Sequence, residues 1–376
     1  MPIYLDYNAS SPIDPRVLNY MVDVYKHSYG NADSRTHYFG TKAKEIVSNS
    51  RNEISKILNI DNTELIFTSG STESNNMAIL GMLKYAISSG RNHFITTSIE
   101  HKTVLESMKY LQKNGCLVDF INPDRSGRVN SDQILSKVTD KTLLVSIMHV
   151  NNETGIIQPV EDVGKFLKQT GTYFHIDATQ SFGKMNDIIR EFEYDLLSFS
   201  GHKLGGPQGI GGLVIRRRSD FRRPPLAPLF YGGQQERGLR PGTTPVALVA
   251  GLAMAAKICE DEYKQNNINC LNIKKSFIES IQGLNYQVNG DQRYCIPNTI
   301  NISFNGIDAE AVFVAVKNEY SFSNGSACTS GNFAPSYVLS AMGLDDTRIL
   351  SALRLSWDGR VKVDFTNLIN YLSSLA

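Results

Sequence analysis

The chain has 376 residues, a formal net charge of +1 and a hydrophobic fraction of 41%. This composition is that of an ordinary soluble globular protein, and the length suggests two domains of unequal size. The near-neutral charge gives no reason to expect direct binding to nucleic acid or to an anionic membrane. The sequence also lacks the roughly 20-residue apolar run of a membrane span and the start of a signal peptide.

The cysteines are odd in number and form no CxxC pair, which argues against a disulfide framework and against a zinc site. They are Cys116, Cys259, Cys270, Cys295 and Cys328. The histidines are spread along the chain, so no metal site is expected. A reducing, cytoplasmic location fits best.

The first part of the chain predicts alternating strands and helices. An extended arm over residues 1–14 precedes a helix from Pro15 to about Tyr25, and an amphipathic helix runs from about Gly40 to Leu58. Strands are then expected at residues 64–68, 93–97, 117–122, 143–148, 173–177, 195–199 and 212–215, with helices at 75–88, 102–113 and 160–169. This alternation predicts a mostly parallel sheet covered by helices on both faces, with ligands outside the carboxyl ends of the strands.

The second part of the chain predicts an α+β arrangement. A long helix from Val246 to about Lys264 is expected to act as a hinge, and the polar run at 265–269 to be a helix end or a loop. Helices are expected near 271–281, at 309–316 and from 364, with strands at 299–304 and 352–356 and a loop at 322–332.

Lys203 is the first candidate for chemistry. It follows the apolar strand 195–199 on a glycine-rich turn that also presents Ser200 and His202. Desolvation lowers the pKa of a lysine, and a neutral amine condenses with a carbonyl such as a cofactor aldehyde. The alternative is an ordinary surface lysine in a polar turn, and this segment alone does not distinguish the two interpretations.

A phosphate cradle is predicted where Thr68-Ser-Gly-Ser-Thr72 joins a strand to a helix. Small residues let backbone N–H groups approach an anion there, and Ser71 and Thr72 add hydroxyl donors. Ordinary N-capping explains the segment equally well. No Walker A or GxGxxG pattern is present, so nucleotide hydrolysis and dinucleotide binding are poorly supported.

Asp177 ends a strand that we expect to lie beside the strand leading to Lys203. Its carboxylate could hold a protonated ring nitrogen, although N-capping of the next helix is an alternative. An acid, a lysine and a phosphate cradle together describe a site for pyridoxal 5'-phosphate. His101 also follows a strand and could stack on the ring and exchange protons, unless it only caps a helix.

Two further side chains are unusual for their surroundings. Cys328 lies in a polar Gly/Ser segment, which suits a nucleophile delivered to a ligand as well as an idle surface thiol. Arg354 is the one charge in the apolar segment 353–357, where it binds either a substrate carboxylate or an acid of the protein.

Taken together, these segments resemble the cysteine desulfurases, within the class V aminotransferase-like branch of fold-type I pyridoxal-phosphate enzymes. The resemblance runs nearly end to end. Its most specific motifs are SFSGHK at 198–203, HVNNETG at 149–155, HIDATQ at 175–180, ERGLRPGT at 236–243 and GSACTSG at 325–331.

The resemblance implies a fold with a mainly parallel seven-stranded sheet in a large cofactor-binding domain, residues 15–255. A smaller α+β domain would comprise residues 1–14 and 256–376 and carry a mobile loop with the catalytic cysteine at about 322–332. It also implies a homodimer in which Thr243 reaches the phosphate bound by the other subunit.

The remaining roles are implied in the same way. Lys203 would carry the cofactor and move the Cα proton, with His101 assisting, and Cys328 would attack the substrate sulfur. The cofactor would be bound by Ser71, Thr72, His101, Asn152, Asp177, Gln180, Ser200, His202, Lys203 and Thr243. The substrate would be bound by Asn31, Asn152 and Arg354.

The implied reaction converts L-cysteine to L-alanine and leaves a persulfide on Cys328, which passes to a sulfur-acceptor protein. The segments SNGSACTSG and LRPGTTP look most like members that supply sulfur for DNA phosphorothioate modification. Sulfur supply for iron–sulfur clusters or tRNA thiolation is the alternative, although the chain ends at Ala376 without the longer tail of scaffold-docking members. Alternatives of another class are a selenocysteine lyase, another class V enzyme, or a non-enzymatic subunit of a sulfur-transfer complex.

Overall fold

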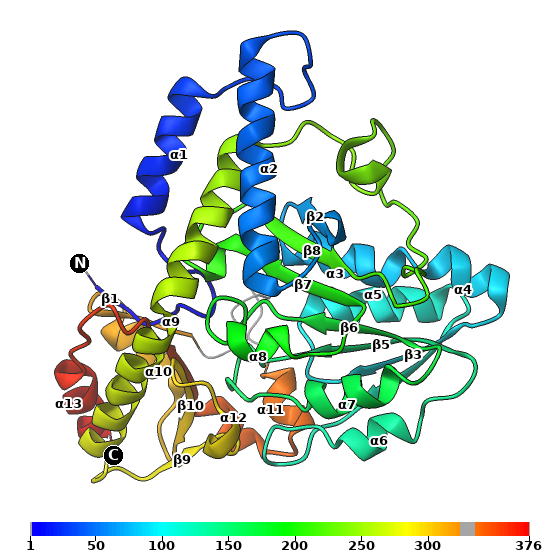
Figure 1. Cartoon of the computed structure of the whole chain (residues 1–376). Helices are drawn as coiled ribbons and strands as arrows, with labels where there is room; N and C mark the ends of the chain where they lie inside the picture. Colours follow the sequence, from blue (N-terminus) through cyan, green and yellow to red (C-terminus); the bar gives the residue numbers. More distant parts are fainter. Residues whose placement is uncertain (1, 324–334, 376) are drawn as a thin grey trace.

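The computed structural model describes residues 2–323 and 335–375, and Cys328 lies outside these ranges. A large sheet with helices on both faces fills one part of the molecule, and a smaller group of strands and helices lies beside it (Figure 1). The predicted fold class is therefore confirmed. Within the described ranges, no helix combines the length and the apolar character that crossing a membrane requires.

The large sheet has seven strands in the order β2-β8-β7-β6-β5-β3-β4. Only β8 runs antiparallel to its neighbours, β2 and β7. The strands are β2 (Leu65–Thr68), β3 (His93–Thr97), β4 (Leu117–Ile121), β5 (Thr142–Met148), β6 (Tyr173–Asp177), β7 (Leu196–Ser200) and β8 (Gly211–Ile215).

Successive residues of these strands pack against opposite faces of the sheet, as the pleat requires. Leu197 and Phe199 belong to one apolar cluster, and Leu196 belongs to the cluster on the other face. The first cluster is covered by α1 (Pro15–His27), α2 (Tyr38–Leu58), α6 (Ser131–Leu135), α7 (Val160–Leu167), α8 (Asn186–Arg190) and α9 (Val246–Ser280). The second is covered by α3 (Ser71–Leu80), α4 (Leu83–Ser89) and α5 (Lys102–Lys113).

The smaller part contains the antiparallel sheet β12-β10-β9 and the parallel pair β1-β11. Leu5, Phe277 and Trp357 belong to its own apolar cluster. The strands are β1 (Ile3–Tyr4), β9 (Tyr286–Val288), β10 (Thr299–Phe304), β11 (Tyr320–Ser321) and β12 (Ala352–Ser356). The helices near them are α10 (Ala309–Val316), α11 (Tyr337–Ala341), α12 (Asp346–Leu350) and α13 (Thr366–Leu375). The domain limits given above stay a prediction.

Two helix predictions are wrong. The polar run 265–269 does not end a helix. It lies inside α9, which is a single helix of 35 residues. Asn267 and Asn269 donate instead to the backbone oxygens of Lys184 and Gly359, at 2.8 and 3.1 Å. These bonds to neighbouring segments satisfy the amides without breaking the helix.

The helix predicted at 75–88 is two helices, and the first begins at Ser71 rather than after a turn. The break falls at Gly81, whose carbonyl accepts a hydrogen bond from the Ala227 N–H at 2.8 Å. A Cβ at Gly81 would lie 3.1 Å from the Ala227 oxygen. The glycine therefore allows a second backbone to approach closely, which the periodicity of the helix does not reveal.

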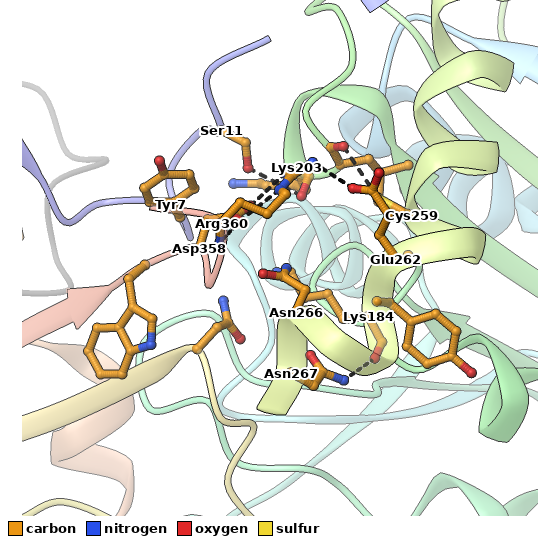
Figure 2. A pocket seen from close by; sticks show the side chains of 15 residues that line it. Tyr7, Ser11, Lys184, Lys203, Cys259, Glu262, Asn266, Asn267, Asp358 and Arg360 are labelled. Atoms are coloured by element: carbon orange, nitrogen blue, oxygen red, sulfur yellow. Dashed lines mark hydrogen bonds and ion pairs between the residues drawn. The ribbon is translucent and has the colours of Figure 1, made fainter. Parts of the chain in front are cut away.

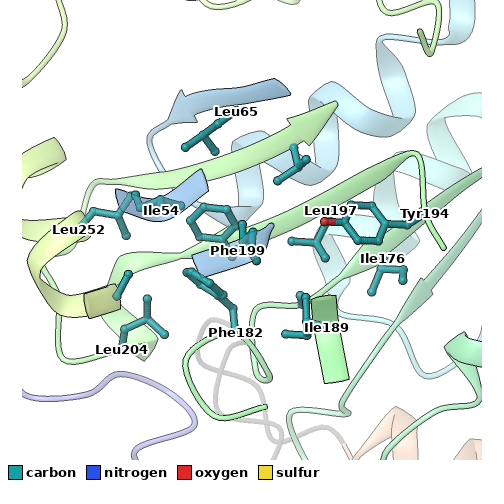
Figure 3. Packing of buried hydrophobic residues seen from close by; sticks show 14 of the residues in the cluster. Ile54, Leu65, Ile176, Phe182, Ile189, Tyr194, Leu197, Phe199, Leu204 and Leu252 are labelled. Atoms are coloured by element: carbon teal, nitrogen blue, oxygen red, sulfur yellow. The ribbon is translucent and has the colours of Figure 1, made fainter. Parts of the chain in front are cut away.

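The packing below the end of β7 fixes the turn that carries Lys203. Phe199 is fully buried and lies against Phe182, with ring centroids 4.5 Å apart, and Leu204 lies close by (Figure 3). The Phe199 ring also fills the space beside Gly212, where a Cβ would come within 2.4 Å of it. The aromatic ring and the glycine thus hold β7 and β8 in one register.

Replacing Phe199 with alanine is expected to lower the free energy of unfolding by about 3–5 kcal/mol, because the lost ring leaves a cavity. Denaturant unfolding followed by fluorescence measures this change. Phe166→Ala is the matched control, since Phe166 on α7 is 43% exposed. Equal losses for the two variants would contradict the account of the core.

Candidate active site

The carboxyl ends of β6 and β7 bring the predicted residues to one edge of the sheet. The two strands are parallel neighbours, with Asp177 paired with Ser198. Asp177 ends β6, and Ser200 ends β7 just before the short 3-10 helix η2 (Gly201–Lys203). The prediction that the acid and the lysine follow adjacent strands is confirmed.

Lys203 points at the amino-terminal arm. Its Nζ donates to the backbone oxygens of Asn8 and Ala9, at 2.5 and 2.6 Å. Ser11 holds the arm in place, because its N–H donates to the His202 oxygen at 2.8 Å and its Oγ to the Lys203 oxygen at 3.3 Å. The arm therefore supplies the Lys203 amine with two backbone oxygen acceptors.

A small cavity of about 30 Å³ lies beside Lys203, between the arm and α9 (Figure 2). Cys259 and Glu262 of α9 line it, together with Arg360 and Lys184. Desolvation lowers the pKa of Lys184 to about 8. A volume of this size holds about one water molecule and is too small for a substrate, so this cavity is not the substrate site.

Asp177 is 4% exposed and is fixed by two neighbours. Asn75 of α3 donates to its Oδ2 at 2.7 Å, and the Thr179 N–H donates to its Oδ1 at 2.9 Å. The hydrogen bond from Thr179 belongs to the local turn that the capping alternative anticipated. The bond from Asn75 aims the carboxylate at a distant element, which a cap does not require.

His101 begins α5 and acts as its N-cap, with Nδ1 accepting from the Thr103 N–H at 3.2 Å. Burial lowers the pKa of His101, and Asp177 opposes this shift. The imidazole is therefore neutral near pH 7. A neutral ring suits both stacking on an aromatic group and accepting a proton.

The segment predicted to be a phosphate cradle lies at the N-terminus of α3. Gly70 precedes the helix with φ of +149°, and a Cβ there would lie 3.5 Å from the Ser200 Oγ. Ser200 Oγ is 2.9 Å from His202 Nδ1, and burial lowers the pKa of His202 to about 4. Ser71 and Thr72 begin α3 directly after Gly70, so the first N–H groups of the helix and two hydroxyl residues follow the point where α3 meets the end of β7.

Asn8 joins several of these residues. Its backbone oxygen accepts from Lys203 and also from Gln180 Nε2, the latter at 2.9 Å. Its side-chain Nδ2 donates to the Asn152 oxygen at 3.2 Å. The side-chain Oδ1 of Asn152 is buried and has no hydrogen-bond partner among the described residues, as expected of a group that binds a ligand.

Arg354 has an acid partner, as one of the two hypotheses required. Its NH2 donates to Asp6 Oδ1 at 2.6 Å, and its NH1 to the Asn152 oxygen at 3.1 Å. The guanidinium is 4% exposed, yet its Nε has no hydrogen-bond partner among the described residues. The guanidinium therefore keeps one donor that neither Asp6 nor Asn152 uses.

Two predicted residues lie apart from this cluster. Asn31 is exposed, and its Oδ1 accepts from the Asp33 N–H at 2.9 Å. Thr243 is exposed in the loop before α9. Among the described residues, neither side chain forms a hydrogen bond with the cluster. The role of Cys328 stays a prediction, because that residue lies outside the described ranges.

Sequence reasoning missed Asn8, Asn75 and Asp6. Asn75 carries a weak signal, since it lies one helical turn after Ser71 and on the same face of α3. Asn8 acts mainly through its backbone oxygen, and Asp6 meets Arg354 only after the chain has folded. No local pattern identifies either of them.

Two buried carboxyl groups flank the site. Glu100 accepts from the Met148 N–H at 2.9 Å, and burial raises its pKa to about 8. Glu153 accepts a hydrogen bond from Ser336, and burial raises its pKa to about 7. Glu100 is therefore mainly protonated near neutral pH, whereas Glu153 titrates in that range, and both carry less negative charge than an exposed carboxylate would.

The residues present fit pyridoxal phosphate. The site offers an amine, an opposed carboxylate, a neutral imidazole and a helix N-terminus lined by hydroxyls. Asn152, whose buried Oδ1 has no hydrogen-bond partner among the described residues, is joined to this cluster through its backbone oxygen, which accepts from Asn8 and Arg354. The amine matches the aldehyde of the cofactor, and the carboxylate matches its ring nitrogen. The imidazole matches the aromatic face, and the helix N-terminus matches the phosphate.

Comparisons with known proteins agree with this site. A model of the family "Aminotransferase class-V" matches residues 3–357. The cysteine desulfurase IscS of Rickettsia massiliae (strain Mtu5) is 40% identical over 356 residues, which are 94% of this chain and 86% of that protein. The crystal structure of DndA from Streptomyces lividans is 43% identical, covers 93% of this chain and 98% of its own, and has a TM-score of 0.83. A structure of SspA in complex with cysteine is 33% identical, covers 96% and 100%, and has a TM-score of 0.82.

The chain therefore belongs to the aminotransferase class-V family. Within that family it is an enzyme of the cysteine desulfurase class, as the sequence motifs predicted.

Glu153→Gln is expected to make the protein more resistant to heat at alkaline pH. Because the folded-state pKa of Glu153 is raised from 4.5 to about 7, its contribution is fully present below pH 4.5 and is lost as the pH rises through 7. Glutamine keeps an acceptor for Ser336 and cannot ionise. Its advantage should grow between pH 5 and pH 8 to about 1–3 kcal/mol, and thermal unfolding at several pH values measures it.

The exposed Glu106→Gln is the matched control, because Glu106 lies on the surface of α5 beside Lys109. A Glu153→Gln advantage that is the same at pH 5 and pH 8 would show that the carboxyl group is not held protonated.

Proposed function

We propose that the protein converts L-cysteine to L-alanine with pyridoxal 5'-phosphate and retains the sulfur as a persulfide on Cys328, from which it passes to an acceptor protein. The observation that carries this proposal is the meeting of Lys203, Asp177 and His101 at one edge of the sheet, beside the N-terminus of α3. The match to cysteine desulfurases over 94% of the chain supports the choice of substrate.

The cofactor would be held by residues from several separate segments of the chain. Asp177 would pair with the ring nitrogen, Gln180 with the ring hydroxyl, and His101 would stack on the ring. Ser71, Thr72, Ser200 and His202 would bind the phosphate, and Asn152 would contact the ring or the substrate. When bound, pyridoxal phosphate supplies a sink for the electrons left behind when the substrate loses its Cα proton.

The chain's own groups would carry the proton and the sulfur. Lys203 Nζ would take the Cα proton of the substrate, and the neutral His101 would assist proton transfer. The Cys328 thiolate attacks the substrate sulfur, and the sulfur–carbon bond of the substrate breaks. The sulfur stays on Cys328, and the carbon skeleton leaves as alanine after taking up protons.

Substrate binding would centre on Arg354. Its planar guanidinium suits a carboxylate, and its Nε is an unused donor beside Asn152. Asn31 would lie near it in the working enzyme. The ion pair with Asp6 would keep the guanidinium in place before the substrate arrives.

A homodimer would complete the site, with Thr243 reaching the phosphate of the other subunit. Thr243 is exposed and therefore available to a second copy. Exposed aromatic residues are also available to an interface, among them Tyr25, Tyr38 and Tyr231 at 61%, 72% and 88% exposure. We expect the enzyme to work in the cytoplasm.

The candidate pathway is DNA phosphorothioate modification. The segments SNGSACTSG and LRPGTTP support it, as does the 43% identity to DndA. Sulfur supply for iron–sulfur clusters or tRNA thiolation is the alternative pathway. A selenocysteine lyase is the alternative activity, and comparing L-cysteine with L-selenocysteine as substrates separates the two.

Incubation with L-cysteine and a thiol reductant is expected to give alanine and sulfide in equal amounts. Cys328→Ala should abolish both products, because no nucleophile remains to accept the sulfur. Cys116→Ala is the matched control and should retain activity, since Cys116 lies in the apolar cluster beneath α5. Undiminished alanine formation in Cys328→Ala would overturn the assigned mechanism.

Arg354→Lys is expected to raise KM for L-cysteine about 10- to 100-fold, because lysine replaces a two-pronged, charge-assisted contact with a single point charge. Steady-state kinetics measure this change. Asp6→Asn removes the internal partner and leaves Arg354 intact, so it should change KM far less. Equal KM increases in the two variants would mean that Arg354 serves the ion pair alone.

A further inference from the structure

A second pair of reactive side chains lies in the smaller part of the molecule, outside the site described above. The Nζ of Lys274 on α9 is 3.2 Å from the Sγ of Cys295 and 3.3 Å from the Ile296 oxygen. Lys274 is only 9% exposed, and in the described ranges it forms no ion pair with a carboxylate. Lysine is seldom buried without an acid, so this placement calls for an explanation.

The pair lines an open, mainly apolar groove of about 700 Å³ between the second half of α9 and the small sheet. Leu271 and Ile278 of α9 form one wall, and Val288 of β9 forms part of the other. Cys295 therefore borders a groove that is open to small molecules in solution, although most of the lysine is covered.

The other described cysteines have different surroundings. Cys116 and Cys270 are buried in apolar clusters. Cys259 donates to the Leu204 oxygen at 3.4 Å. Among the four cysteines that the structure describes, Cys295 is the one with an amine within hydrogen-bond distance.

Cys295 also contacts the loop that carries Asn152. Its Sγ lies 3.4 Å from the Thr154 oxygen, and its backbone pairs with Ile156 in an isolated bridge. A Cβ added at Gly155 would come within 3.1 Å of the sulfur. A chemical change at this sulfur would therefore alter the packing of Thr154 and Gly155, which follow Asn152 closely in the sequence.

We propose that Lys274 and Cys295 form an oxidation-sensitive pair, in which hydrogen peroxide joins Sγ to Nζ as a reversible sulfenamide cross-link. In the first step the thiol is oxidised to a sulfenic acid, and the peroxide is reduced to water. In the second step the neutral amine attacks the sulfur, the S–N bond forms, and the sulfenic hydroxyl leaves as water with a proton from the amine. The sum is R–SH + R'–NH2 + H2O2 → R–S–NH–R' + 2 H2O.

Sulfenic acids condense with nearby nitrogen atoms in this way, and a nitrogen already beside the sulfur favours that route over further oxidation. Burial raises the pKa of the Cys295 thiol, and Lys274 opposes the shift. Oxidation is therefore expected to be slower than at an exposed thiol and to speed up as the pH rises.

The experiment exposes the purified full-length protein to hydrogen peroxide at pH 8, then digests it without a reductant and maps the peptides by mass spectrometry. We expect a linked pair of peptides joined at Lys274 and Cys295, about 2 Da lighter than the two unlinked peptides together. A thiol reductant added before digestion should abolish the linked species. Cys295 recovered only as a free thiol or as its oxygen acids would overturn the proposal.

Lys274→Arg and Lys275→Arg are the matched variants, because both lysines line the same groove on α9. Lys275→Arg should retain the cross-link. Lys274→Arg should lose it and yield oxygen acids of Cys295 instead. A link from Cys295 to Lys275 would contradict the geometry. If a variant fails to fold, peptide mapping of the oxidised wild-type protein alone still shows which lysine is linked to Cys295. The outcome is independent of desulfurase activity, since no substrate or cofactor is involved.

Discussion

The contact between Lys203 and the backbone oxygens of Asn8 and Ala9 is the constraint on which the site depends. It places a lysine from the large sheet against an arm whose Leu5 belongs to the smaller apolar cluster. The same Asn8 oxygen accepts from Gln180, and the Asn8 amide reaches Asn152. One residue of the arm therefore fixes groups from several segments relative to one another. Hydrogen bonds from Lys203 to backbone oxygens can be exchanged without moving another side chain, which suits a group that must change its partner during a reaction.

The charges around this contact follow from burial. Burial raises the pKa values of Glu100 and Glu153 and lowers those of His101 and His202, so each of these groups carries less charge near pH 7 than it would in water. Asp177 and Arg354 are fixed by hydrogen bonds from and to other elements. Asp177 and Arg354 are thus held in place at the edge of the sheet, where we propose that they bind the cofactor and the substrate. A low local dielectric strengthens their interactions with a bound ligand.

Much of this arrangement could be predicted from the sequence. The apolar alternation of the strands predicted the sheet, and parallel order placed the ends of β6 and β7 side by side, so Asp177 and Lys203 could be paired before any coordinates were known. The motif resemblance then supplied the enzyme class, which composition and periodicity alone do not define.

Other features depend on contacts between distant segments. The continuation of α9 through residues 265–269 rests on hydrogen bonds to Lys184 and Gly359. The break at Gly81 rests on the approach of Ala227. Asn8 works through its backbone, and any residue type offers the same oxygen, so the sequence does not mark it. The alternatives for Arg354 could not be separated either, because its acid partner, Asp6, lies at the other end of the chain.

The central claim is that Lys203 is the amine that carries the cofactor. Reduction of the pyridoxal-phosphate-loaded protein with borohydride, followed by peptide mapping, tests it most directly, because reduction fixes the cofactor to the lysine that holds it. The account predicts that the label is found on Lys203. A label on another lysine, such as Lys184 in the neighbouring cavity with its pKa of about 8, would contradict it.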